Sequence, residues 1–595
     1  MCGFVVTLGG PNPDTLNQIK HRGPDSSGHF EDAMVYMGFN RLATVSTVVG
    51  NQPMHINEYV IVFNGEIYNY KELAEEFGCS SATDTEVILH GYIKLGKEIV
   101  NRLRGMFAFV IYNKETKEVF GARDMFGIKP LYYKHCFNKI YMASEYKAIP
   151  GARPVDELGL QTYLTLQYPL PPHTMVSGIH HVKPGHYFTW SAKRGFHEDC
   201  YFKPQLYPFG NSAKPDPQRS VTTEDVRKVI EESVEKHLDA NVPVGCFLSG
   251  GVDSTIVTSV ANKLHPGIKT FSVGFDVPGY SELQVAEKTA ELLKTDHKSL
   301  IITEDMFIDA IEDVVRHMDD PVADPSAVGL YLLSKMAAKD VTVALSGEGA
   351  DEFFGGYRIY NEYYSLKNVS SLPQPFKVRL NQISKALPNG MKGKSFLHRA
   401  TTPLNQRYVG NAKIFTDLEV KELYKYYDKQ FNVYQLLNPL FKEDLTYIQQ
   451  MQNVDINTWM VGDILQKGDK MSMANSLEVR TPFLDKEVFN VAKNLTDDQK
   501  INNGTTKYLL REAFSDILPE HVVNRPKLGF PTPIRVWLQG DLGDYVTEVI
   551  VKSDIDTLLN KKCIFDMLVE HKDGIKDNSR KIWSIFILCL YMGRL

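Results

Sequence analysis

The sequence predicts an α/β protein with a β-rich N-terminal domain and a larger C-terminal domain, which is built on a parallel sheet and ends in a largely helical part. The chain has 595 residues, too many for one hydrophobic core. Roughly the first 150 residues contain short β-type runs separated by Gly, Asn and Asp. Later apolar runs end in Gly-rich turns and alternate with helical stretches, the pattern of strand–turn–helix units.

The composition is that of an ordinary globular protein, with 43% hydrophobic and 23% charged residues. The net charge of −6 and the lack of a dense Lys/Arg run argue against a nucleic-acid partner. The seven cysteines are scattered without a CxxC pair, which predicts a reducing compartment and no zinc site. No signal-peptide pattern is present, and the longest apolar run, 582–592, is too short to span a bilayer. We therefore expect a cytoplasmic protein without a membrane segment, whose last helix is buried.

Several β-type runs mark the N-terminal domain, including GFVVTL (3–8), EYVIVFNG (58–65) and MFAFVIYN (106–113). Their turn residues favour antiparallel strands. The stretch TDTEVILHGYIKLG (83–96) predicts a helix among them. Taken alone, the dipeptide Asn64–Gly65 also fits a two-residue hairpin turn.

A stretch rich in Pro and polar residues, 203–221, is the best candidate for a linker. It predicts a first domain over residues 1–202 and a second over 222–595. The second domain is expected to open with a helix, because Thr222 and Asp225 have the spacing of a capping box.

Three apolar runs of the second domain end in small residues: VPVGCFLSGG (242–251), KTFSVGF (269–275) and VTVALSGEG (341–349). Helical stretches separate them, which predicts a doubly wound parallel sheet with helices on its faces. From about residue 357 onward we expect helices and no further series of strands.

The turn SGGVDS (249–254) has the features of a phosphate-binding loop. Ser249, Gly250 and Gly251 let the backbone approach an anion at the start of a helix, whose amides and dipole favour negative charge. Ser254 adds a hydroxyl donor. Asp253 would place a carboxylate beside the phosphates, which requires a cation such as Mg²⁺ between them. A tight strand–helix turn that uses glycine only for its geometry is the simpler alternative.

A second acidic turn, LSGEGADEFFGGY (345–357), also follows an apolar strand and supplies Glu348, Asp351 and Glu352. Turns at the carboxyl ends of parallel strands face one crevice, so Asp253 and Asp351 are expected to share magnesium. The stretch NGMKGKS (389–395) ends like a Walker loop but has Pro where that motif needs its first Gly. We expect a solvated loop there.

These motifs resemble two known families. Residues 249–254 resemble the PP-loop of ATP pyrophosphatases, which adenylate a substrate and release pyrophosphate. Cys2 followed by a series of further motifs is similar to the glutamine amidotransferase domain of the N-terminal nucleophile (Ntn) type, which implies an αββα sandwich. Those motifs are HRGPDSSG (21–28), NRLATV (40–45), NQPM (51–54), FNGEIYNY (63–70) and TDTEV (83–87).

The amidotransferase resemblance gives Cys2 a role. Removal of Met1 would leave Cys2 with a thiol and a free α-amine of near-neutral pKa, able to accept the thiol proton. The resemblance implies that Asn64 and Gly65 stabilise an oxyanion. It also implies a glutamine site formed by Arg41, Leu42, Val45, Asn64, Gly65, Glu66 and Asp84. Each residue alone has a simpler interpretation: a small apolar Cys2, a surface Arg41, or Asp84 as a helix cap.

Together the two halves resemble the glutamine-dependent asparagine synthetase family over nearly the whole chain. Matching motifs also occur at 320–335, 469–485, 506–514 and 525–533. The implied reaction converts aspartate, ATP, glutamine and water to asparagine, AMP, pyrophosphate and glutamate through β-aspartyl-AMP, with ammonia passed from the glutaminase site.

The same resemblance assigns further residues to the ATP site. The residues expected to hold the adenosine part of ATP are Leu248, Val273, Ser346 and Gly347. Glu348 would assist formation of the intermediate. Lys527 would neutralise charge on the phosphates or on the intermediate.

Three alternatives stay open. An amidotransferase of the same architecture could amidate another carboxylate, although SGEGADE (346–352) favours asparagine over the SGDGGDE-like loop of such relatives. A β-lactam-forming synthetase is disfavoured because that branch lacks the nucleophilic cysteine. A storage protein would be expected to have degraded motifs in its second half. The expected partners are the small-molecule substrates; the oligomeric state stays open, with a homodimer as one option.

Overall fold

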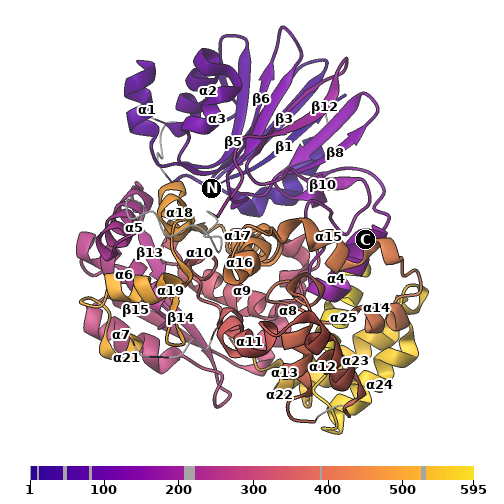
Figure 1. Ribbon diagram of the computed structural model, residues 1–595. Helices are drawn as coiled ribbons and strands as arrows, with labels where there is room; N and C mark the ends of the chain where they lie inside the picture. The colour runs from indigo at the N-terminus through magenta and orange to yellow at the C-terminus, as the bar shows by residue number, and fades with distance from the viewer. Residues whose placement is uncertain are drawn as a thin grey trace.

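The protein consists of a β-rich upper lobe, drawn in indigo and violet, and a larger lower lobe, as the computed structural model in Figure 1 shows. We call these the N-terminal lobe and the C-terminal lobe. The N-terminus lies where the lobes meet (Figure 1). The structure describes residues 2–9, 13–44, 50–79, 83–206, 221–388, 391–523, 525, 529 and 531–594.

Two antiparallel six-stranded sheets form the N-terminal lobe. Sheet A has the strand order β10 (Ile179–His181), β8 (Tyr132–Cys136), β9 (Lys139–Ala143), β1 (Cys2–Leu8), β3 (Val35–Arg41) and β2 (Ser26–Glu31). Sheet B has the order β12 (Gly195–Cys200), β11 (His186–Ser191), β7 (Val119–Arg123), β6 (Gly105–Asn113), β5 (Tyr59–Ile67) and β4 (Met54–Ile56).

The two sheets pack face to face, and helices cover their outer faces. In β1, Phe4 and Val6 pack between the sheets, while Val5 packs on the outer face against the 3-10 helix η1 (Pro13–Arg22). This alternation is the period-2 pattern of a strand buried on both faces. The outer face of sheet B is covered by α1 (Tyr70–Phe77), α2 (Asp84–Leu95) and α3 (Ile99–Arg102). The expected αββα sandwich is confirmed, with short 3-10 helices as its fourth layer.

The hairpin-turn interpretation of Asn64–Gly65 is wrong. Both residues lie inside β5, where Gly65 is paired with Phe107 of β6. A Cβ atom on Gly65 would come within 2.1 Å of the Met106 carbonyl oxygen. The glycine is therefore required by close backbone approach within the sheet, and not by a turn.

A five-stranded parallel sheet forms the centre of the C-terminal lobe. Its order is β15 (Asp296–Ile302), β14 (Lys269–Phe275), β13 (Val244–Phe247), β16 (Val343–Leu345) and β17 (Glu478–Arg480). On one face lie α5 (Thr223–His237) and α6 (Val252–Leu264), and on the other α8 (Glu304–Met318) and α9 (Ser326–Ala337). The chain order reverses between β13 and β16, which is where ligands bind in such sheets. The predicted capping box of Thr222 and Asp225 is present at the start of α5.

The sequence after residue 357 is mostly helical, as expected, but it also contributes β17, the fifth strand of the parallel sheet. This strand pairs in parallel with β16, from Val343 opposite Glu478 to Leu345 opposite Arg480. Glu478 and Arg480 are fully buried. The sequence of this strand shows no apolar run, because two of its three residues are charged. These side chains can be buried because they neutralise each other, and Arg480 also pairs with Glu66 of the N-terminal lobe.

Further helices complete the C-terminal lobe. They are α7 (Leu283–Leu293), α10 (Ala350–Phe354), α11 (Glu362–Ser370), α12 (Gln374–Ala386), α13 (Lys394–Thr401), α14 (Asp417–Leu423), α15 (Val433–Leu437), α16 (Tyr447–Asn457), α17 (Leu465–Met473), α18 (Lys486–Ala492), α19 (Asp497–Lys500), α20 (Tyr508–Ala513), α21 (Glu520–Val523), α22 (Ile534–Trp537), α23 (Asp541–Lys552), α24 (Lys561–Lys572) and α25 (Ser579–Met592). A two-stranded hairpin, β18 (Ile501–Asn502) and β19 (Thr505–Thr506), lies before α20. Within the described ranges, none of the helices has the length and apolar character needed to cross a membrane.

One helix of the N-terminal sequence packs in the C-terminal lobe. Helix α4 (Glu157–Leu166) lies near α14 and α25 (Figure 1), and the Tyr163 hydroxyl donates to the Ser584 carbonyl at 2.6 Å. The final helix is buried, as predicted. The boundaries 1–202 and 222–595 stay predictions, and most of the expected linker, residues 207–220, lies outside the described residues.

The apolar core continues across the contact between the lobes. Phe126 of the N-terminal lobe packs against Phe202, and its ring centroid lies 5.2 Å from that of Phe353 and 5.5 Å from that of Phe489. All three partners of this ring are apolar, so its burial joins the lobes without any directional bond.

We predict that Phe126→Ala lowers the free energy of unfolding by about 3–5 kcal/mol, because it leaves a cavity in this core. Thermal denaturation followed by calorimetry would show a lower midpoint or two separated transitions. Phe137→Ala is the matched control, since that ring is 98% exposed. An unchanged midpoint for Phe126→Ala would show that the aromatic contact does not hold the lobes together.

Candidate functional site

A pocket opens in the N-terminal lobe at the Cys2 end of β1. It is lined by Cys2, Arg41, Leu42, Ala43, Thr44, Gly50, Gln52, Phe63, Gly65, Glu66, Thr83, Asp84 and Thr85. The structure thus brings together all but two residues of the glutamine site predicted from sequence. Asn64 contacts Cys2 from β5, and Val45 lies outside the described residues.

Asn64 presents a hydrogen-bond donor beside the Cys2 thiol. Its Oδ1 accepts the Cys2 backbone N–H at 3.1 Å, which directs Nδ2 the other way. That Nδ2 is buried and has no hydrogen-bond partner in the described part of the chain. A buried donor without a partner costs about 1–3 kcal/mol, and such a donor can stabilise an oxyanion that forms during a reaction.

The Cys2 thiol is held as the neutral form. Burial raises the pKa of this thiol, and Sγ lies 3.8 Å from the Leu42 carbonyl oxygen, an acceptor that suits the protonated thiol. A thiol attacks as its thiolate, so this cysteine needs a base. Removal of Met1 would give Cys2 an α-amine that could serve as this base.

Two acidic side chains form one end of the pocket. Asp84 is the first residue of α2, and its oxygens accept the backbone N–H groups of Ile67 and Thr85 at 3.3 and 2.8 Å. Burial raises the pKa of Asp84 to about 6. Burial also raises the pKa of Glu66, and Arg480 acts against that shift.

The interpretation of Asp84 as a helix cap is wrong, because Thr83 is the N-cap and accepts the Glu86 N–H. Asp84 is therefore available to a ligand. Arg41 lies at the rim, where its Nη1 donates to Asn51 at 3.4 Å. A guanidinium, two acidic groups and a thiol suit a ligand with a carboxylate, an ammonium and an electrophilic carbon.

The predicted phosphate loop joins β13 to α6 in the C-terminal lobe. Ser254 Oγ accepts the Ser249 backbone N–H at 3.1 Å and lies 3.0 Å from Ser249 Oγ. Gly250 has a φ of +73°, a conformation that favours glycine. Leu248 directly follows β13, and Val273 lies in the neighbouring parallel strand β14. The loop leads into the N-terminus of α6, where backbone amides can bind an anion.

The second acidic loop meets the first, as the sequence predicts. A Cβ atom on Gly347 would lie 2.8 Å from Cβ of Asp253 and 3.0 Å from the Ser254 nitrogen. Lys507 Nζ lies 2.5 Å from Asp253 Oδ2 and 2.7 Å from Asp351 Oδ1. One cation therefore neutralises the carboxylates of both loops.

The other two acidic residues of this loop differ in burial. Glu348 is partly exposed. Glu352 is buried, accepts the Tyr357 hydroxyl at 2.6 Å, and has its pKa raised to about 8 by burial. Glu352 therefore supports the fold of the loop, whereas Glu348 is less buried.

The carboxylates of these loops fit a magnesium ion that is held jointly with phosphates. Asp253 Oδ1 is buried and makes no hydrogen bond to the described residues, while Asp351 lies beside the same ammonium. Across the described ranges, no cluster of three or more His, Cys, Asp or Glu side chains could hold a metal alone. Mg²⁺ is commonly bound by one or two carboxylates and completed by substrate phosphates.

Sequence reasoning missed two residues of these sites. Lys507 lies in the motif TKYLLREAF (506–514), and Arg480 in the motif over 469–485. Both are buried cations whose partners are distant in sequence. The only signal available was a Lys directly before a helix and an Arg that follows a single apolar residue, Val479. Lys527 lies outside the described residues.

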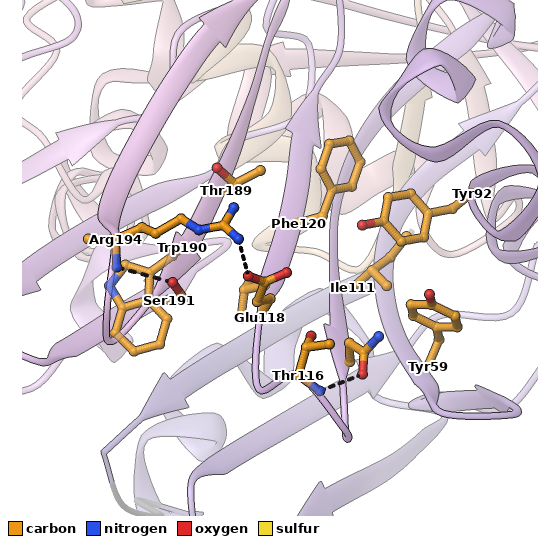
Figure 2. A pocket seen from close by; sticks show the side chains of 13 residues that line it. Tyr59, Tyr92, Ile111, Thr116, Glu118, Phe120, Thr189, Trp190, Ser191 and Arg194 are labelled. Carbon is orange, nitrogen blue, oxygen red and sulfur yellow. Dashed lines mark hydrogen bonds and ion pairs between the residues drawn. The ribbon is translucent and has the colours of Figure 1, made fainter.

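A further cavity is separate from both sites. It has a volume of about 260 Å³ at the edge of sheet B, lined by aromatic residues such as Tyr59, Tyr92 and Phe120 (Figure 2). Its charged residues, Glu118 and Arg194, neutralise each other at 3.2 Å. None of the predicted site residues lines it.

Comparisons with known proteins match the two lobes to two families. Residues 225–592 match the family described as "Asparagine synthase", and residues 1–202 match "Glutamine amidotransferase domain". "Asparagine synthetase [glutamine-hydrolyzing] 1" of Bacillus subtilis (strain 168) is 44% identical, over 99% of this chain and 96% of that protein.

Two further relatives are less similar in sequence. "Putative asparagine synthetase [glutamine-hydrolyzing]" of Mycobacterium tuberculosis (strain ATCC 25618 / H37Rv) is 40% identical over 99% of this chain and 97% of its own length. "Amidase chyE" of Penicillium rubens is 27% identical over 91% of this chain and 88% of its own length. The chain belongs to the asparagine synthase family.

The raised pKa of Asp84 predicts a pH dependence of glutamine binding. Because the folded-state pKa of about 6 lies above the ordinary value, the carboxylate forms only as the pH rises through about 6. We expect kcat/KM for glutamine to rise over that interval, and Asp84→Asn to lower it and to flatten the rise.

Glu86→Gln, on the same helical turn, is the control and should keep the wild-type profile. A profile with no change near pH 6 in the wild-type protein would contradict the assignment of Asp84.

Proposed function

We propose that the protein makes asparagine from aspartate, using ATP to activate the acceptor and glutamine as the nitrogen donor. One observation carries this proposal: a single chain of this family holds the Cys2 pocket and the paired loops around Asp253 and Asp351. The products are asparagine, AMP, pyrophosphate and glutamate.

In the N-terminal lobe, Cys2 attacks the amide carbon of glutamine after its α-amine accepts the thiol proton. Asn64 Nδ2 and the Gly65 amide stabilise the oxyanion. Collapse of the tetrahedral intermediate releases ammonia and leaves a thioester, which water hydrolyses to glutamate. Arg41 binds the substrate carboxylate, Asp84 binds its ammonium with help from Glu66, and Leu42 and Val45 line the site.

In the C-terminal lobe, the β-carboxylate of aspartate attacks the α-phosphate of ATP, and pyrophosphate leaves. Ammonia then displaces AMP from β-aspartyl-AMP. The turn of Ser249, Gly250, Gly251 and Ser254 binds the phosphates, and the adenosine site is formed by Leu248, Val273, Ser346 and Gly347.

Cationic groups neutralise the negative charge of the phosphates. Mg²⁺ held by Asp253 and Asp351 supplies charge neutralisation when it is bound. Lys507 holds these two carboxylates together. Glu348 assists adenylation, and Lys527 neutralises charge that shifts during the reaction.

An amidotransferase that acts on a different carboxylate is the second candidate. The relative named as an amidase in Penicillium rubens keeps most of the same length at 27% identity, so the architecture alone does not define the acceptor. The loop SGEGADE favours aspartate. Pyrophosphate release measured across a panel of carboxylates separates the two candidates: release with another acid and none with aspartate would favour the second.

Cys2→Ala is predicted to lower glutamine hydrolysis by at least about a thousandfold, because the methyl group cannot attack the amide. The variant should still make asparagine from ammonium salts, and better as the pH rises and more free ammonia is present. The mass of the wild-type protein should correspond to a chain that starts at Cys2. A variant that keeps glutamine-dependent synthesis would refute the role of Cys2.

Glu348→Ala is predicted to abolish aspartate-dependent pyrophosphate release while ATP binding stays largely intact, since Glu348 acts on adenylation and not on the nucleotide. Pyrophosphate release and equilibrium ATP binding are the two measurements. Glu443→Ala, an exposed glutamate of the same lobe, should leave both unchanged. Equal rates for the Glu348 variant and the wild-type protein would exclude a role for this carboxylate.

A further inference from the structure

Arg480 extends from the sheet of the C-terminal lobe to Glu66, which lines the Cys2 pocket of the N-terminal lobe. It is the last residue of β17 and is fully buried. Its Nη2 donates to Glu66 Oε2 at 3.0 Å. Glu66 lines the Cys2 pocket and directly follows Asn64 and Gly65 on β5.

The guanidinium is anchored firmly on its own lobe. Its Nε donates to Glu478 Oε1 at 2.6 Å, and its Nη1 donates to the carbonyl oxygens of His237 and Asp239, each at 2.9 Å. With the bond to Glu66, four hydrogen bonds use most of its five N–H groups. The planar donor set therefore has one orientation, and Glu66 meets a rigid cation.

Glu66 depends on this partner. It is 2% exposed, and a buried carboxylate needs a cation and hydrogen bonds to offset lost hydration. Burial and the neighbouring carboxylates Asp84 and Glu478 disfavour the charged form of Glu66 by raising its pKa. Arg480 gives the largest electrostatic effect in the opposite direction, ahead of the N-terminal ammonium.

The main chain of Arg480 contacts the other site. The Ser346 backbone N–H donates to the Arg480 carbonyl oxygen at 2.9 Å. Ser346 is the first residue of the acidic loop after β16, next to Gly347 and Asp253. One residue thus holds the glutamine pocket with its side chain and the nucleotide loop with its backbone.

We propose that Arg480 is a positioning residue of the glutamine site, supplied by the C-terminal lobe, which holds the Glu66 carboxyl group in place for the substrate ammonium. The proposal rests on the proposed function, because it takes the Cys2 pocket to bind glutamine. It makes the glutaminase pocket incomplete without β17, the strand that pairs with β16 beside the nucleotide loop.

The test compares Arg480→Lys in the wild-type background and in a Glu66→Gln background. Lysine keeps the charge but cannot reach all four acceptors. We expect Arg480→Lys to raise KM for glutamine at least about tenfold, the scale for a broken buried ion pair. In the Glu66→Gln background the same change should alter KM less than about twofold, because residues that act together are not additive.

Two further measurements separate positioning from general support of the fold. Ammonia-dependent asparagine synthesis should stay within about twofold of wild type in Arg480→Lys, since the bond from Ser346 is to the main chain. Arg104→Lys is the matched control: Arg104 also joins the lobes, through Asp485 at 2.8 Å and Glu232 at 2.6 Å, but lies outside the pocket. It should leave KM for glutamine unchanged.

The inference is overturned if Arg480→Lys leaves KM for glutamine unchanged, if both activities fall together, or if the effects of the two substitutions add. Should Arg480→Lys fail to fold, Glu66→Asp tests the same contact by withdrawing the carboxylate from Arg480. An unchanged KM for glutamine in Glu66→Asp also overturns the inference. A wild-type protein that makes no asparagine from either nitrogen source would instead refute the proposed function.

Discussion

Charged side chains buried between the two lobes must find partners, because each unpaired ion would lose several kcal/mol of hydration free energy. Arg22 of the N-terminal lobe is fully buried and donates to Glu145 at 2.9 Å and to Asp469 of α17 at 2.8 Å. Lys147 of the N-terminal lobe pairs with Asp319 of the C-terminal lobe at 3.0 Å. Such pairs are directional, so they define how the lobes sit relative to each other, whereas the aromatic contacts around Phe126 only hold them together.

This constraint reaches the glutamine pocket. Arg22 Nε also donates to the Cys2 carbonyl oxygen at 3.2 Å, so a cation anchored on α17 holds the nucleophile's main chain. Arg480 does the same for Glu66 from β17. The glutamine pocket is therefore positioned at two points by the C-terminal lobe, which suits an enzyme whose glutaminase product is consumed in that lobe.

Local motifs were sufficient to predict much of the fold and the sites. The loop at Ser249–Ser254 and the capping box at Thr222 depend on neighbours within a few residues, so their residue types alone are informative. The contacts of Cys2 with Asn64, and of Asp253 with the 345–357 loop, were predicted only through family resemblance or sheet topology. Strand β17, Lys507 and Arg480 escaped prediction, because their roles arise from partners more than a hundred residues away and leave no periodic pattern. The expected turn at Asn64–Gly65 failed for the same reason: β6 supplies the close approach that requires Gly65.

Direct transfer of ammonia between the two sites can be tested by an isotope competition, which measures the source of the nitrogen in the asparagine side chain. The wild-type protein would be incubated with aspartate, ATP, Mg²⁺ and glutamine labelled with nitrogen-15 in its amide, in the presence of excess unlabelled ammonium, and the asparagine analysed by mass spectrometry. If ammonia passes directly between the sites, the side-chain amide of asparagine keeps the nitrogen-15 label nearly undiluted. Asparagine labelled only in proportion to the bulk ammonia pool would contradict it.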